Sequence, residues 1–417
     1  MKSLFLFLAF TLVYAQISPE DKGETGFITV HEKGTEKYQL FYWLFKPQNE
    51  SVNNPPIIFW LEGGPGCSSL LCVFRENGPY RFKEGEPKPV WNKYTWSDKA
   101  YLLYIDQPLG TGYSNCSDTS LIPEDQKGVS KHLMIFLEKF FEKYPLLENK
   151  DFYVTGHSYG GHYVPYFTHD LLKRQSKTEK RLPLNLKGVA IGNGFFKGST
   201  QSLAYAKFNL DNNLYDRPFS YIASSIVYRL VDIFAKFGAL RQAYFFFQLG
   251  RKISNGFESR FNIYNREMAK GYDGTKLMQY ANSDEGRGKM GVGDRLWIPC
   301  SPKVMERMID KDFYADMTYY LQEVIKSGLK VVLYSGVLDW ICCTEGVIMY
   351  LEEISWEGKE KFFAQEWKNF TVNETVAGEY KEVDKFTFYK VYNAGHMTTI
   401  EKPEVGTYII DKLTGQA

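Results

Sequence analysis

The residues with the strongest chemical signal form the pentapeptide Gly156-His157-Ser158-Tyr159-Gly160. A G-x-S-x-G pattern that follows a strand and precedes a helix is typical of a nucleophile elbow, a sharp turn that holds a serine backbone strained and its hydroxyl exposed. The apolar run over residues 152–154 supplies the preceding strand. Because the pattern by itself arises easily by chance, its position after a strand is what predicts a nucleophilic Ser158.

A serine hydroxyl needs a base to take its proton and a carboxylate to orient that base. The chain has six histidines, at positions 31, 132, 157, 162, 169 and 396. In α/β hydrolases the triad runs serine, acid, histidine along the chain, which favours His396 as the base. His157 adjoins the serine on a tight turn and should point elsewhere, and His162, one helical turn further on, is expected to be a structural residue.

The acid is expected at the end of a strand. Asp339 follows the apolar run 331–334 through a Ser335-Gly336 turn. Asp316 and Asp384 are the other candidates, but neither lies at a comparable strand end. The residues therefore predict a triad of Ser158, Asp339 and His396, and the alternative is a coincidental elbow in a noncatalytic α/β protein.

The sequence predicts that alternating strands and helices position this triad. Short buried strands are expected at 57–61, 101–105, 151–155, 189–191, 331–334 and 386–391, and 136–144 has helical spacing. Such alternation favours an α/β fold with a mostly parallel sheet covered on both faces. From 197 to 310 the pattern becomes helical and aromatic, so we expect a helical insertion between two core segments, 16–196 and 311–417.

Composition excludes some classes of protein. The 417 residues carry 50 Lys or Arg and 49 Asp or Glu, and this balance gives no basic field for nucleic acid. The hydrophobic content of 44% excludes intrinsic disorder. Aromatic residues make up 17% of the chain, and a large aromatic core is the default interpretation, with aromatic-lined pockets as the alternative.

The N-terminus is predicted to be a targeting segment rather than part of the fold. Lys2 precedes an apolar stretch of about ten residues and a Val13-Tyr14-Ala15 site, which together predict a signal peptide over residues 1–15. A buried N-terminal helix is the alternative. No later apolar run is long enough to span a membrane. We therefore expect a secretory protein, extracellular or in a lysosome- or vacuole-like compartment.

Cysteines and glycosylation motifs agree with an oxidising compartment. There are six cysteines, too few to form the scaffold and without zinc-ligand spacing: Cys67, Cys72, Cys116, Cys300, Cys342 and Cys343. Four Asn-x-Ser/Thr motifs offer candidate glycosylation sites: Asn49, Asn115, Asn369 and Asn373. Asn115 is the weakest of these because Cys116 lies inside its motif.

Several blocks in the right order make the chain resemble the serine carboxypeptidases, from about residue 26 to residue 410. They are WLEGGPGCSS at 60–69, ENGP at 76–79, DQPLGTGYS at 106–114, GHSYGGHYVP at 156–165, IGNG at 191–194, YSG at 334–336 with Asp339, and AGHM at 394–397. The resemblance implies an α/β-hydrolase fold with a helical insertion over the site, in agreement with the insertion expected at 197–310.

The resemblance also implies roles for individual residues. Ser158, Asp339 and His396 match the family's nucleophile, acid and base, and the backbone amides of Gly64 and Tyr159 match its oxyanion hole. Cys67 and Cys300 match a disulfide pair. Cys342 matches a position that the family often fills with a free thiol beside the pocket, and Met397 matches an apolar wall. Neither a metal nor an organic cofactor is implied.

Two departures affect the group that binds the substrate's terminal carboxylate. The family usually has Asn before its two glycines, where this chain has Glu62 beside Gly63, and Glu before the nucleophile, where this chain has His157. Glu76 is retained. The base motif also continues as Thr398-Thr399-Ile400-Glu401 where the family favours Val-Pro-x-Asp.

We expect a protonated His157 either to bind the substrate carboxylate or to neutralise the two glutamates, and the pKa of His157 to be raised by them. The clamp would then operate in an acidic compartment. The alternative is that His157 and Glu62 merely hydrogen-bond to each other.

Peptide or protein C-termini are thus the expected substrates. The enzyme is expected to release their C-terminal amino acids through an acyl-enzyme on Ser158. Three other functions stay open: a serine carboxypeptidase-like acyltransferase, an esterase or endopeptidase, and a noncatalytic binding protein on the same fold. The sequence does not distinguish a monomer from a homodimer, and it does not pair the four remaining cysteines.

Overall fold

The computed structural model describes residues 23–82, 88–177, 179, 181–215, 217–256, 260–269 and 271–416. The signal peptide expected at residues 1–15 lies outside these described residues. Within them, none of the helices combines the length and the apolar character that crossing a bilayer would need.

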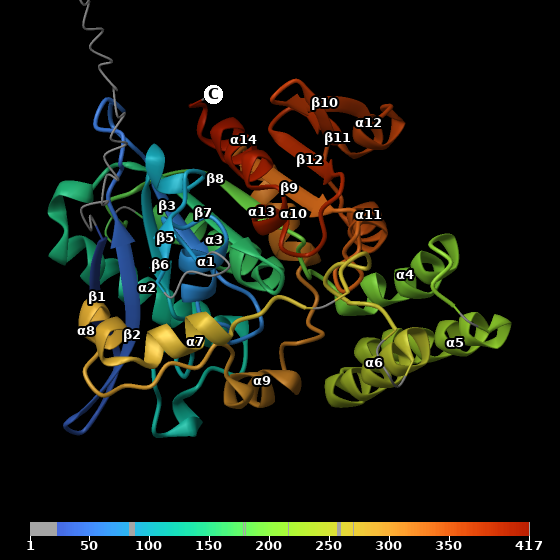
Figure 1. Ribbon diagram of the computed structural model, residues 1–417, viewed down its shortest axis with the longest axis horizontal. Helices are drawn as coiled ribbons and strands as arrows, with labels where there is room; N and C mark the ends of the chain where they lie inside the picture. The colour runs from blue at the N-terminus through green and yellow to red at the C-terminus, as the bar shows by residue number, and fades with distance from the viewer. Residues whose placement is uncertain are drawn as a thin grey trace, which may run out of the picture.

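A ten-stranded sheet runs through the molecule (Figure 1). Its strands are, from one edge to the other, β1 (Gly23–Lys33), β2 (Glu36–Phe45), β6 (Tyr101–Ile105), β3 (Ile57–Leu61), β7 (Asp151–His157), β8 (Asn185–Gly192), β9 (Lys330–Gly336), β12 (Phe386–Val391), β11 (Thr375–Val383) and β10 (Lys368–Val372). The strands from β6 to β12 pair in parallel, and the strands outside them pair antiparallel. The six parallel strands are the six predicted from the sequence, so the α/β fold class is confirmed.

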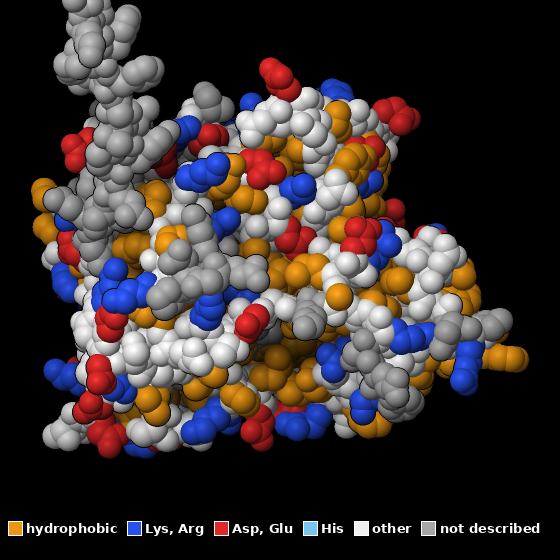
Figure 2. Space-filling model, viewed as in Figure 1, with side chains coloured by type: hydrophobic (Ala, Val, Ile, Leu, Met, Phe, Trp, Pro, Cys, Tyr) orange, Lys and Arg blue, Asp and Glu red, His pale blue; other side chains and the backbone are white. Residues whose placement is uncertain are grey.

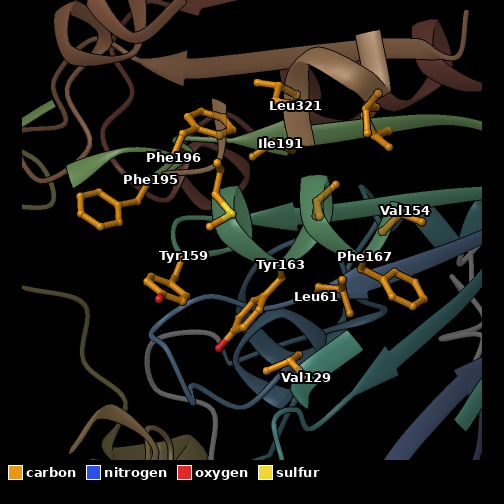
Figure 3. Close-up of a cluster of buried hydrophobic side chains, with 14 of the residues drawn as sticks. Leu61, Val129, Val154, Tyr159, Tyr163, Phe167, Ile191, Phe195, Phe196 and Leu321 are labelled. Carbon is orange, nitrogen blue, oxygen red and sulfur yellow. The ribbon is translucent and has the colours of Figure 1, made fainter. Parts of the chain in front are cut away.

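Helices cover both faces of the sheet and divide the core into two clusters. One cluster packs α2 (Gln126–Lys143), α3 (Gly160–Gln175) and α10 (Thr318–Lys326) against the sheet, and the other packs α1 (Leu70–Arg75) and α14 (Pro403–Thr414) against the opposite face. Figure 3 shows part of the first cluster, where Tyr163 and Phe167 of α3 lie among Leu61, Val154 and Val129. Many of the chain's aromatic residues are buried in these two clusters, as the default interpretation of the composition expected.

The loops that follow the parallel strands all leave the same edge of the sheet. Glu62 follows β3, Ser158 follows β7, Asn193 follows β8, Asp339 lies beyond β9 and His396 lies beyond β12. Crevices at the carboxyl ends of parallel strands are the usual location of sites in such sheets. Residues far apart in the sequence are therefore brought to one place.

The segment expected as one helical insertion, 197–310, lies in two places. The helices α4 (Gly198–Asp211), α5 (Pro218–Lys236) and α6 (Leu240–Asn255) pack on one another and form a lobe beside the sheet (Figure 1). In contrast, α7 (Thr275–Asn282) and α8 (Asp284–Met290) lie near β2 and α1, where Tyr280 and Met290 join the second core cluster. The last helix of the segment is α9 (Pro302–Ile309). The outer boundaries of the insertion stay a prediction.

The remaining elements complete the C-terminal third and a small ribbon. They are α11 (Thr344–Glu353), α12 (Lys359–Ala364), α13 (Thr398–Glu401) and the two-stranded pair β4 (Tyr80–Arg81) and β5 (Val90–Trp91). A disulfide joins Cys67 to Cys300, 233 residues apart, and it ties the glycine-rich loop after β3 to the start of α9, as expected. The other four cysteines, at 72, 116, 342 and 343, are free thiols.

Candidate active site

Ser158 lies on a strained turn between β7 and α3. Its φ is +58°, in the left-handed region that non-glycine residues rarely occupy. The turn is held by hydrogen bonds from the Ser158 amide to the Gly192 carbonyl (3.0 Å) and from the Phe195 amide to the Ser158 carbonyl (2.8 Å). A Cβ on Gly63 would lie 2.8 Å from the Cβ of Ser158, so the loop after β3 can approach the elbow only with glycine at that position. This backbone has the features of a nucleophile elbow.

His396 and Asp339 form a buried pair. The distance from His396 Nδ1 to Asp339 Oδ2 is 2.7 Å, and both side chains are almost completely shielded from solvent. Asp339 also accepts a hydrogen bond at Oδ1 from the Cys342 amide (3.2 Å). In this arrangement the carboxylate fixes one ring nitrogen of His396 and leaves the other for chemistry.

Asn193 is a site residue to which the sequence analysis gave no role. Its Nδ2 donates to Asp339 Oδ2 (2.8 Å), and its Oδ1 accepts from the Thr398 hydroxyl (2.9 Å). Asn193 has a φ of +44°, a conformation that asparagine tolerates better than most residues. The IGNG block at 191–194 was noticed only as part of the family resemblance, and its position at the end of β8 was the signal that could have identified it.

Six of the ten predicted catalytic, oxyanion-hole and substrate-binding residues line one cleft of about 720 Å³, and Asp339, Tyr159, Gly63 and Glu76 do not belong to its lining. Its lining includes Ser158, His396, Gly64, Met397, Glu62 and His157, together with residues of α6 and α9. Figure 2 shows a hollow with hydrophobic side chains at its base in the region between α9 and α6. The cleft thus opens between the body of the molecule and the helical lobe.

Cys342 lies close to both the nucleophile and the base. Burial raises the pKa of its thiol, and the nearby Ser158 hydroxyl partly offsets that effect. The Sγ atom of Cys342 lies within 4.8 Å of ligand atoms of both Asp339 and His396. The hydrogen bonds found among the described residues do not include one from the Ser158 hydroxyl to His396. Catalytic hydrogen bonds are often long or misaligned in free enzymes and tighten when substrate binds. The nucleophile and base are therefore neighbours in one cleft.

The backbone amides of Gly64 and Tyr159 are available for an oxyanion. Gly64 has a φ of +113°, which requires glycine, and Tyr159 directly follows the elbow serine. In the described part of the chain neither amide donates to a protein acceptor. One such donor is worth on the order of 10²–10³ in rate, and the oxyanion-hole role expected for these two amides stays a prediction.

Glu62, Glu76 and His157 form a buried charged cluster next to the cleft. His157 Nδ1 lies 3.6 Å from Glu62 Oε1, at ion-pair distance, and His157 Nε2 lies 2.8 Å from the His396 carbonyl oxygen. Glu62 accepts hydrogen bonds from Trp60 Nε1 (3.0 Å) and the Cys72 thiol (2.7 Å). Glu76 accepts one from the Thr399 hydroxyl (2.6 Å).

Mutual interaction sets the charges of this cluster. Burial opposes the charged form of His157, but Glu62 and Glu76 outweigh burial and raise its pKa to about 9. Burial also opposes ionisation of Glu62, but its ion pair with His157 and the hydrogen bonds from Cys72 and Trp60 outweigh burial and lower the pKa of Glu62. The pKa of Glu76 is raised, mainly by burial. The cluster is thus an ion pair beside a carboxyl group whose pKa is raised.

These contacts favour one of the two roles expected for His157. Both ring nitrogens face protein oxygens, so pairing with the glutamates is better supported than direct donation to a substrate carboxylate. With a pKa of about 9, His157 is charged at neutral as well as at acidic pH. Its protonation therefore does not confine the cluster to an acidic compartment.

Two buried triplets could in principle hold a cation. Asp339, Cys342 and His396 form one, and Glu62, Glu76 and His157 form the other, each with candidate ligand atoms within 4.8 Å of one another. In both triplets carboxylate oxygens already accept protein hydrogen bonds. The expectation that the chemistry needs no metal stays a prediction.

The loop of the insertion that contains Tyr264 and Asn265 is hydrogen-bonded to the loop that contains His396. The His396 amide donates to the Tyr264 carbonyl (2.6 Å), and the two rings lie 5.3 Å apart. Glu401 Oε2 accepts from Asn265 Nδ2 (2.6 Å) and from the Gly395 amide (2.8 Å), and Glu401 Oε1 accepts from the Tyr272 hydroxyl. The altered base motif thus provides a bridge between the insertion and the His396 loop.

The other candidates lie away from the reacting groups. His162 stacks on Tyr159 at 4.3 Å between ring centroids and lies 3.3 Å from Asp312, in keeping with a structural role. Asp316 pairs with Lys197, and Asp384 lies in the turn between β11 and β12. All four glycosylation candidates are exposed, at Asn49, Asn115, Asn369 and Asn373.

Comparison with known proteins identifies the family. The family model described as serine carboxypeptidase matches residues 15–416. A serine carboxypeptidase-like protein of Oryza sativa subsp. japonica is 33% identical over 390 residues, covering 91% of this chain and 90% of its own. The chain belongs to the serine carboxypeptidase family.

Further relatives agree with this assignment. The venom serine carboxypeptidase of Apis mellifera is 30% identical to this serine carboxypeptidase-family chain, covering 93% of it and 83% of its own length. The structure of Kex1, a prohormone-processing carboxypeptidase of Saccharomyces cerevisiae, superposes with a TM-score of 0.83 at 25% identity, covering 94% and 91% of the two chains. These matches show a serine-type peptidase of the α/β-hydrolase fold and do not favour the acyltransferase alternative.

Proposed function

We propose that this chain releases C-terminal amino acids from peptides through an acyl-enzyme on Ser158, in the secretory pathway. The observation that supports this most directly is the strained Ser158 elbow in a cleft that also contains the buried His396–Asp339 pair. Within the described chain the Gly64 and Tyr159 amides donate to no protein acceptor, which supports their expected role as oxyanion-hole donors. An extracellular or lysosome- or vacuole-like location is part of the proposal, as is the predicted signal peptide.

The mechanism assigns one task to each group. His396 takes the proton of Ser158, whose oxygen attacks the last peptide carbonyl, and the Gly64 and Tyr159 amides bind the oxyanion. His396 then protonates the departing amino acid, and water activated by the same imidazole releases the shortened peptide. Asp339 holds the ring of His396 and stabilises its charged form.

An acidic optimum follows from Glu76 rather than from His157. When Glu76 is neutral, the Glu62–His157 ion pair leaves the buried cluster without net charge. Deprotonation of Glu76 adds a negative charge near a bound terminal carboxylate and repels it. We therefore expect the KM for free-carboxylate peptides to rise as the pH increases through the raised pKa of Glu76.

The test compares an N-blocked dipeptide with its amide and its ester. Release of the free C-terminal amino acid, lost by at least about 10³-fold in Ser158→Ala, is the expected result. Turnover of the ester alone would indicate an esterase, transfer to an added alcohol an acyltransferase, and inertness a binding protein. Labelling of the wild type by a fluorophosphonate, absent in Ser158→Ala, reports the nucleophile independently of substrate choice.

A further inference from the structure

A second cavity of about 590 Å³ adjoins the active-site cleft. The two share four lining residues: Arg251, Ile263, Tyr264 and Gly271. The shared wall is close to the chemistry, because the ring of Tyr264 lies 5.3 Å from that of His396. An extended peptide advances about 3.3 Å per residue, so a chain acylated at Ser158 reaches this wall within a few residues.

The described lining of this cavity is strongly basic. It contains four cations, Arg251, Lys252, Arg260 and Arg266, and a single carboxylate, Glu267, which is exposed and 3.6 Å from Arg266. The stretch 251–271 as a whole has five Lys or Arg and two Glu, against a net charge of +1 for the entire chain. In Figure 2, Lys or Arg side chains border the hollow between the body and the lobe.

Arg251 is the cation best placed to meet a substrate. It lies one residue before the last turn of α6, is partly buried, and lines both cavities. No carboxylate lies within ion-pair distance of Arg251 among the residues that the structure describes. Arg266 lines the same cavity and has a buried Nε without a hydrogen-bond partner. Guanidinium groups bind carboxylates through paired hydrogen bonds, so two such groups favour a carboxylate ligand.

The cleft contains little acidic charge to oppose such a ligand. Its cationic lining is Arg75 and Arg251, and its one described carboxylate is Glu62, which is already paired with His157. Arg251 therefore has no carboxylate of the cleft left to neutralise it, whereas Arg75 is attracted to Glu76 and Asp273 outside the cleft lining. An acidic peptide would enter a positive potential, which raises its local concentration and its rate of association.

We propose that this cavity recognises an Asp or Glu side chain near the C-terminal end of the peptide substrate, with Arg251 as its principal partner. The inference rests on the proposed peptidase function and adds to it a substrate class. It concerns a side-chain carboxylate, which is distinct from the terminal carboxylate that every carboxypeptidase substrate carries.

The kinetic test uses N-blocked pentapeptides in which one Glu or one Gln occupies each successive position from the C-terminus. Assays at about pH 6 and low ionic strength keep the substrate carboxylate ionised and the attraction unscreened. We expect kcat/KM to favour Glu over Gln by about five- to tenfold at one or two neighbouring positions. Arg251→Gln should bring that ratio close to one, and Arg251→Glu should shift the preference toward Lys.

A matched control lies on the same helix. Arg241 is exposed, pairs with Asp310 and lines neither cavity, so Arg241→Gln should keep the Glu-to-Gln ratio. A wild-type ratio of one at every position would overturn the proposal, as would a ratio that Arg251→Gln leaves unchanged. A preference spread evenly over all positions would also overturn it, because it would indicate only long-range attraction.

Binding separates this proposal from the proposed function. Fluorescent Glu and Gln peptides titrated into Ser158→Ala report recognition without turnover. Tighter binding of the Glu peptide, lost in Ser158→Ala/Arg251→Gln, supports the cavity even if the wild type cleaves no peptide. Equal binding of both peptides, alongside Ser158-dependent cleavage of the Gln peptide, would overturn the acidic preference and leave the peptidase assignment intact.

Discussion

At the scale of single residues, the acid of the triad depends on a neighbour that carries no charge. The Asp339 carboxylate accepts hydrogen bonds from three groups: the His396 ring, the Cys342 amide and the Asn193 side chain. Asn193 is also bonded to Thr398, just beyond the base. One amide side chain therefore fixes the carboxylate relative to the loop that carries His396.

Replacing Asn193 with Gly tests this role. Glycine accepts the φ of +44° and removes only the amide, so the strain of other substitutions is avoided. A hydrogen bond to a charged group is worth about 1.5–3 kcal/mol, so we expect kcat to fall about tenfold or more with little change in KM. The rate of fluorophosphonate labelling should fall in parallel. A rise in KM at unchanged kcat would contradict a role through Asp339.

At the scale of elements, the sequence predicts the parallel strands better than their edges. The strands at 57–61 and 101–105 are predicted with their observed bounds, because strands buried on both faces are short continuous apolar runs. The strand at 386–391 is predicted with its observed bounds as well, although Thr387 and Lys390 interrupt its apolar run. The antiparallel strands β1, β2, β10 and β11 were not predicted. β1 and β10 have many partly exposed residues, and the turn from β10 to β11 places Asn373 and Glu374 at positive φ without the glycine that usually marks a hairpin.

The same contrast holds for the candidate site. The triad could be predicted because each member follows a strand in a recognisable pattern. The sequence could not predict the positions of three other residues near the cleft, Tyr264, Arg251 and Glu401, because these depend on where the insertion folds back onto the sheet. The segment 197–310 reads as uniformly helical, and nothing in its local pattern indicates that α7 packs beside α1 while α6 lines the cleft.

Glu401 tests the coupling between two such elements. Glu401→Ala removes the acceptor shared by Asn265, Tyr272 and the Gly395 amide. We expect faster limited proteolysis within 260–275 and a loss of about tenfold in kcat/KM, because buried donors left unpaired cost about 1–3 kcal/mol each. Glu357→Ala, at an exposed position away from the cleft, should change neither quantity. Unchanged proteolysis in Glu401→Ala would show that the bridge does not hold the loop.

At the scale of the whole molecule, buried titratable groups tie stability to pH. Burial raises the pKa of Asp106 to about 7 and lowers that of His132 to about 4, and these two act in opposite directions between about pH 4 and 7. Above about pH 7 the Glu62–His157 pair becomes, among these groups, the main source of the pH dependence of stability. The chemistry of the active site and the stability of the fold are therefore linked through His157.

The sign of this linkage gives a prediction for the folded protein. The folded state raises the pKa of His157 from 6.5 to about 9, so it binds the proton more tightly than the unfolded chain. The contribution of His157 protonation to the free energy of unfolding is complete below about pH 6.5 and is lost as the pH rises toward 9. This loss amounts to roughly 3 kcal/mol. We expect the thermal midpoint at a fixed scan rate to fall by a few degrees between pH 7 and pH 9. His157→Gln should flatten this profile, and His31→Gln, on β1, should keep it. A ring-proton NMR titration of the wild type, placing the His157 pKa near 6.5, would refute the prediction without any variant.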